Sequence, residues 1–160
     1  EVQPFSLVED EHRELLPKMF RRGDYGWRDA EWVVQWYGRR FMSGFPDRDR
    51  RALEDAYDDN DYEAVHDAIS AAVDADSAAG MLDHLTGLAG VDVPIGSAFC
   101  QFIDPERYVV VDERQWDVLH EAGELDAGKL RAVSGDLPGG RRAVRLFAVG
   151  PLPGAVGART

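Results

Sequence analysis

The amino-acid sequence predicts an all-α protein, and two observations support this fold class. Apolar side chains recur at helical spacing through most of the chain, as in the stripe formed by Trp32, Val33, Trp36 and Tyr37, and this is the spacing of one buried helix face. Only Tyr108 to Val111 is apolar and β-branched over consecutive positions, and this run is too short to build a sheet. No internal repeat is visible.

Composition predicts one domain followed by a tail. A chain of 160 residues, 44% of them hydrophobic, is long enough to bury a sizeable core. We expect residues 1–137 to form a single helical domain. Residues 138–160 contain no acid, four arginines and five glycines, which favours a flexible or irregular basic tail. A basic arm that touches DNA and a tail altered by a frame change in the gene are alternatives.

Capping residues and apolar stripes predict the helices of the first half. The first helix is expected over 7–20. Asp29 is expected to cap the second helix, which Gly44 and Pro46 end. A short charged helix over 47–57 comes next. Asn60 is then expected to cap a helix over 61–73, where apolar residues recur every four positions.

The second half predicts a pair of helices joined by a glycine-containing turn. Ser77 is expected to begin the first of the two, and Pro94 is well placed as the first helical residue of the second. Pro105 should end that second helix near Ile103, because the residue before a proline is disfavoured in the helical region. Asp112 then begins a candidate capping box for one further helix.

The turn carries a motif of the form hydrophobic-x-x-hydrophobic-x-Gly-hydrophobic, with a small residue five positions after its last member. The matching residues are Leu85, Leu88, Gly90, Val91 and Gly96. This segment, near 85–96, resembles the hairpin of the HhH-GPD superfamily, the helix-hairpin-helix DNA glycosylases of the endonuclease III type. The resemblance implies a helix-hairpin-helix fold and a catalytic aspartate after the second helix, where Asp112 stands.

The same resemblance implies that the hairpin contacts DNA. The residues at the corresponding positions are Gly87, Gly90, Val91, Asp92, Val93 and Pro94. Two of them depart from the family pattern. Asp92 replaces the second glycine of the hairpin, and its charge is unfavourable beside a phosphate. Pro94 replaces the lysine nucleophile of the bifunctional enzymes and has no amine to form a Schiff base.

A glycosylase without that lysine uses water as the nucleophile. Release of a base passes through an oxocarbenium-like sugar, which a fixed carboxylate stabilises. Asp112 is the candidate catalytic residue. A purely structural interpretation is also open, because an aspartate before a helix is an ordinary N-cap. The two interpretations are compatible, since the catalytic aspartate of the family that the chain resembles also begins a helix.

Aromatic residues supply candidates for a base pocket. An extruded base is held by aromatic or apolar side chains, and Trp27 and Trp116 are the two candidates. Trp32 and Trp36 are assigned to the core because their helical spacing is typical of a buried face. Cys100 lies among apolar residues and is interpreted as a small buried hydrophobe. The four histidines show no metal-ligand spacing, and we expect neither a metal nor a cofactor.

The charge balance is strongly acidic. Thirty acids oppose eighteen bases, for a net charge of −12, and only Lys18 and Lys129 are lysines. Such a composition is associated with proteins of salt-loving archaea. The competing interpretation is an acidic partner-binding surface or a nucleic-acid mimic, in which the acids would gather on one face. No apolar run reaches membrane-spanning length and no signal segment is evident, so we expect a cytoplasmic protein.

Three functions therefore stay open. The first is DNA-base recognition with monofunctional N-glycosylase chemistry in base excision repair. The second is a catalytically inactive helix-hairpin-helix scaffold that binds DNA or a protein partner. The third is an acidic helical interaction protein in which the hairpin match is coincidental. The sequence does not specify the oligomeric state or the base.

The halophilic interpretation makes a prediction about stability. At pH 7 an acidic surface repels itself, and salt screens this repulsion because the Debye length falls to about 3 Å at 1 M. We expect the melting temperature to rise clearly between low salt and molar potassium chloride, as measured by circular dichroism. A flat or falling dependence would favour the mimic.

Overall fold

The computed structural model of the chain describes residues 5–39 and 46–110, which form helices and connecting turns without any strand. The all-α prediction is confirmed for this part of the chain. The helices are α1 (Phe5–Arg22), α2 (Trp27–Arg39), α3 (Asp47–Asp58), α4 (Tyr62–Asp74), α5 (Ala78–Leu85) and α6 (Val93–Ile103).

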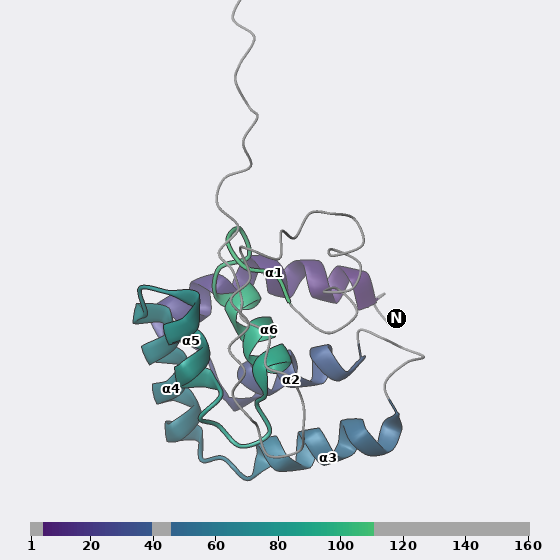
Figure 1. The fold of residues 1–160 in the computed structure, drawn as a ribbon. Helices are drawn as coiled ribbons and strands as arrows, with labels where there is room; N and C mark the ends of the chain where they lie inside the picture. Colours follow the sequence, from purple (N-terminus) through teal and green to yellow (C-terminus); the bar gives the residue numbers. More distant parts are fainter. Residues whose placement is uncertain (1–4, 40–45, 111–160) are drawn as a thin grey trace, which may run out of the picture.

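Helix α6 is the centre of the packing. Every residue from Ile95 to Ile103 is buried, as expected of a helix that is apolar all round and surrounded by others. Helices α1, α2 and α5 pack directly against it. In Figure 1, α1 crosses one end of the bundle, α3 crosses the opposite end, and α4 and α5 lie together at one side.

The start of α2 differs from the prediction. The helix begins at Trp27, so Asp29 lies inside its first turn and is not the N-cap. The Asp29 carboxylate instead accepts a hydrogen bond of 2.8 Å from the backbone N–H of Gly26. This is the backward half of a capping box, in which a side chain at the third helical position satisfies the N-cap amide.

Asn60 also has a role other than the predicted one. Asp61, not Asn60, is the N-cap residue of α4, and its side chain makes no capping hydrogen bond. The Asn60 side chain turns to the hairpin, where Oδ1 accepts from the Ala89 N–H at 2.9 Å and Nδ2 donates to the Ala89 carbonyl at 2.9 Å. Nδ2 also donates to the carbonyl of Tyr57 at 2.8 Å. One amide therefore joins the α3–α4 connection to the α5–α6 turn.

The predicted hairpin is present as a helix, a turn and a helix. Ser77 caps α5 by accepting from the Gly80 N–H at 3.1 Å. The turn follows Leu85, and α6 begins at Val93, one residue before Pro94, which was predicted as its first residue. It ends at Ile103, as the position of Pro105 predicted. Leu85, Leu88 and Ile95 are all buried. The predicted succession of helix, turn and helix is thus confirmed for the described residues.

Two glycines let the hairpin pack closely. A Cβ at Gly96 would lie 2.9 Å from Leu82 Cδ2, so the small residue sets the approach of α6 to α5. Gly90 has a φ of 72°, a conformation that side chains other than glycine rarely adopt. A Cβ at Gly90 would lie 2.6 Å from the backbone nitrogen of Tyr57. Because Gly90 has no Cβ, the turn can pack directly against the end of α3.

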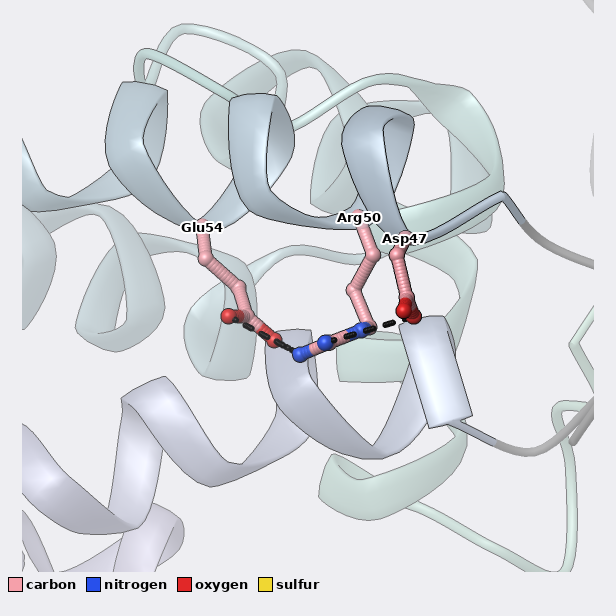
Figure 2. Close-up of polar contacts among 3 residues, drawn as sticks. All are labelled: Asp47, Arg50 and Glu54. Atoms are coloured by element: carbon pink, nitrogen blue, oxygen red, sulfur yellow. Dashed lines mark hydrogen bonds and ion pairs between the residues drawn. The ribbon is translucent and has the colours of Figure 1, made fainter.

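Helices α2 and α3 are joined through Arg50. Its aliphatic stem lies on Gly38, where an added Cβ would be 3.1 Å from Arg50 Cγ. Its guanidinium pairs with Asp47 at 3.5 Å and with Glu54 at 3.2 Å (Figure 2). The three residues lie one turn apart along α3, a spacing at which opposite charges stabilise a helix.

The Gly90 contact predicts a large effect of one methyl group. We expect Gly90→Ala to lower the free energy of unfolding by about 2–5 kcal/mol, because a positive φ costs a residue with a Cβ about 1–2 kcal/mol and overpacking adds about 1–3 kcal/mol. Urea denaturation measures the loss. The matched control is Gly87→Ala in the same turn, where the added Cβ is 3.4 Å from its nearest neighbour. Equal effects of the two substitutions would contradict the assigned contact.

Candidate functional site

The N-terminus of α6 is the place where a helix-hairpin-helix would present backbone amides to a phosphate. Here Asp92 occupies it. The Asp92 side chain accepts from the Ile95 N–H at 3.1 Å, and its carbonyl accepts from the Gly96 N–H at 2.8 Å. A carboxylate at a helix N-terminus is stabilised by the helix dipole. The charge of Asp92 thus takes the place of an external anion.

Three amides of the turn are engaged within the protein. The N–H of Ala89 donates to Asn60, the N–H of Leu88 to the Leu85 carbonyl, and the N–H of Val91 to the Leu88 carbonyl. Of the six predicted hairpin residues, Gly87 is exposed, Val91 is buried, and Gly90, Asp92, Val93 and Pro94 are intermediate. On one side the turn therefore packs against the rest of the protein, and at Gly87 it is exposed to solvent.

The segment leading toward Asp112 is fixed by a buried glutamine. Gln101 of α6 accepts a hydrogen bond of 3.0 Å from the Val110 N–H through Oε1. Tyr108 and Val110 are buried, whereas Val109 between them is 47% exposed. This alternation is that of an extended segment with one inward face. Asp112, Trp116 and the 138–160 tail lie outside the described residues.

Trp27, the other candidate for a base pocket, is half-buried and lines an open hollow of about 600 Å³. The wall from α2 carries Trp27, Arg28, Glu31 and Gln35, and the wall from the α3–α4 connection carries Asp58, Asn60, Asp61 and Tyr62. We call it the acidic hollow. The amide of Asn60 is committed to the hairpin, so it is not available to read a base edge.

Tyr57, whose ring packs against Trp27, carries a buried hydroxyl. Tyr57 is fully buried, and its hydroxyl has no hydrogen-bond partner in the part of the chain that the structure describes. Burial raises the pKa of Tyr57 far above its ordinary value, and the charge of Glu31 adds to the shift. Nothing in the sequence indicated that this hydroxyl would lack a partner.

The two tryptophans that were assigned to the core, Trp32 and Trp36, are structural. Trp36 is buried and Trp32 is partly buried, and both meet the ring of Phe102 edge-on, at centroid distances of 4.9 Å and 5.3 Å. Their assignment to the core is confirmed. Cys100 is fully buried, and burial raises its thiol pKa to about 12. A thiol in that environment is inert as a nucleophile.

Residues 5–39 and 46–110 hold no group of three or more His, Cys, Asp or Glu side chains arranged to bind a metal ion. None of the helices in these ranges has the length and apolar character needed to cross a bilayer. Comparison of the chain with protein-family models, curated proteins and solved structures finds no match. The resemblance to the HhH-GPD superfamily therefore rests on the chain's own residues.

The position of Asp92 predicts how a DNA contact would respond to charge. Asp92→Asn keeps a side-chain oxygen that can cap α6, so we expect the free energy of unfolding to change by less than about 0.5 kcal/mol. We expect it to tighten binding of a duplex oligonucleotide at low salt, because one charge that repels the phosphate backbone is removed from the hairpin.

The matched control is Asp10→Asn, which removes an exposed charge from α1. Both variants change the net charge equally, and fluorescence anisotropy with a labelled duplex compares them. An equal gain in affinity from the two substitutions would show that the hairpin lies away from the DNA.

Proposed function

We propose that this protein recognises a base in DNA and releases it by monofunctional N-glycosylase chemistry, with Asp112 as the carboxylate. One observation carries the proposal. The hairpin leads into a buried helix, and Gln101 of that helix holds an extended segment whose last described residue, Val110, stands two positions before Asp112. This order of elements is the one that the resemblance implies.

The chemistry follows from the residues at two positions. Pro94 lies in the first turn of α6 and has no amine, so a covalent imine at this position is excluded. Water is then the nucleophile that completes base release. In this proposal the carboxylate of Asp112 stabilises the positive charge that develops on the sugar and orients that water.

The charge of the chain shapes how DNA would bind. The net charge is −12, and the N-terminus of α6 already holds a carboxylate. At 1 M salt the Debye length is about 3 Å, so the repulsion between protein and phosphate is largely screened. The gain from counterion release is also lost. Recognition then depends on hydrogen bonds and stacking, and duplex binding should be strongest at high salt.

A second candidate function is a noncatalytic scaffold, and a specific observation favours it. Asp92 occupies the place of a phosphate at α6, and Asn60 holds both polar backbone groups of Ala89. A hairpin bound in this way packs helices without any ligand. In this case the fold would present its other surfaces to a protein partner.

Replacement of Asp112 distinguishes these two functions. Asp112→Asn retains an oxygen that can cap a helix and removes the negative charge. We expect release of free base to fall by at least about 100-fold, which is the effect of removing one preorganised electrostatic contact from a transition state. Binding of the duplex and the melting temperature should change little.

The assay compares wild type, Asp112→Asn and the control Asp83→Asn in molar potassium chloride, with damaged and mispaired duplexes. Asp83 is exposed on α5, and its replacement makes the same change in charge. Equal release by wild type and Asp112→Asn would remove Asp112 from the mechanism. Absence of release by wild type on every duplex would support the scaffold.

A further inference from the structure

Gln101 is a polar side chain within the apolar centre of the bundle. It is 6% exposed, and its neighbours in α6, Cys100 and Phe102, are fully buried. Its Oε1 accepts from the Val110 N–H at 3.0 Å, whereas its Nε2 has no hydrogen-bond partner in the part of the chain that the structure describes. A buried amide donor without an acceptor is unfavourable, so packing alone does not explain why a glutamine occupies this position.

The chain reverses its direction after α6. The N–H of Tyr108 donates at 3.1 Å to the carbonyl of Asp104, the residue that follows the helix. The N–H of Val110 then donates to Gln101, three residues further back along α6. The segment 108–110 therefore runs antiparallel to α6, in the direction of the hairpin. Pro94 stands seven residues before Gln101, about two helical turns, so both lie on one side of α6.

The side chains of this segment alternate between core and solvent. Tyr108 and Val110 are 3% and 2% exposed, whereas Val109 is 47% exposed. Successive residues of an extended chain point to opposite sides, and each advances the chain by about 3.3 Å. Every second residue thus lies on the side that faces α6.

We propose that Gln101 is a positioning residue for Asp112, with Oε1 holding the approaching segment and Nε2 donating to the Asp112 carboxylate. In this proposal the alternation continues for two residues beyond Val110, so that Asp112 takes the inward side. A carboxylate is a strong acceptor for a buried amide, because the hydrogen bond is charge-assisted. The inference rests on the proposed function, in which Asp112 is the carboxylate of the reaction, and it adds the group that orients that carboxylate.

The first test does not depend on activity. Proton–nitrogen NMR observes the side-chain amide of Gln101, identified as the pair of signals that is missing from Gln101→Met. We expect Asp112→Ala to shift these signals upfield, because a charge-assisted acceptor is lost. The control Asp83→Ala, at an exposed position on α5, should leave them in place. Unchanged Gln101 signals in Asp112→Ala would show that the inference is wrong.

The second test separates the two ends of the amide. Gln101→Met removes both polar groups, whereas Gln101→Glu, when ionised at alkaline pH, keeps an acceptor for Val110 and has no donor. In molar potassium chloride, we expect both variants to slow single-turnover release of base by about 10-fold or more, with the Kd for the duplex within about 2-fold of wild type. Only Gln101→Met should speed hydrogen exchange of the Val110 amide.

The control for a general loss of stability is Ile69→Val, at a fully buried position on α4, which should leave both the release of base and the Val110 exchange unchanged. If Gln101→Met does not fold, Gln101→Glu makes the comparison. An active wild type whose Gln101 variants release base as fast as Ile69→Val would contradict the inference and leave the proposed function intact. A wild type that releases no base from any duplex would contradict the proposed function, and a response of the Gln101 amide to Asp112→Ala would still support the contact.

Discussion

The pairing of Asn60 with Ala89 is the interaction on which the arrangement of the described helices depends. One side-chain amide bridges segments 29 residues apart and satisfies both polar backbone groups of Ala89. Its third hydrogen bond, to the carbonyl of Tyr57, fixes the end of α3 at the same point. Hydrogen bonds of this kind contribute only about 1 kcal/mol each. Their effect is geometric, because they determine where the α5–α6 turn meets the rest of the bundle.

The contact between this turn and the end of α3 gives a structural explanation for the glycine of the motif. Gly90 has a positive φ and would place a Cβ 2.6 Å from the backbone of Tyr57, so packing alone explains the glycine. The motif therefore predicts a helix–turn–helix geometry without requiring a phosphate. Asp92 is consistent with this, since it caps α6 from within the chain. The proposed DNA function is therefore supported by the order of elements that leads from α6 to Val110, and not by a phosphate-binding role of the turn.

Local patterns in the sequence predicted the local features and missed the long-range ones. The end of α6 and the cap at Ser77 depend on nearby residues, and both were predicted correctly. Asp29 and Asn60 were wrongly assigned as N-caps, because a polar side chain before a helix does not reveal which donor it will meet. The partner of Asn60 lies in another turn, and the walls of the acidic hollow come from separate helices. The spacing of residues along one helix cannot show which residues of separate segments lie close together.

The acidic residues of this chain lie in at least three different structural environments, which the net charge alone does not distinguish. Asp92 stabilises a helix end, Asp47 and Glu54 hold Arg50 against α2, and the carboxylates of the hollow have no cationic partner in the described part of the chain. Surface charge that serves only solubility needs no fixed neighbours. The carboxylates of the hollow instead lie near Trp27 and Tyr62, which are held by contacts with other residues. The distinction between a halophilic surface and a recognition surface is therefore a matter of local structure, and it can be measured as a difference between two variants of equal charge.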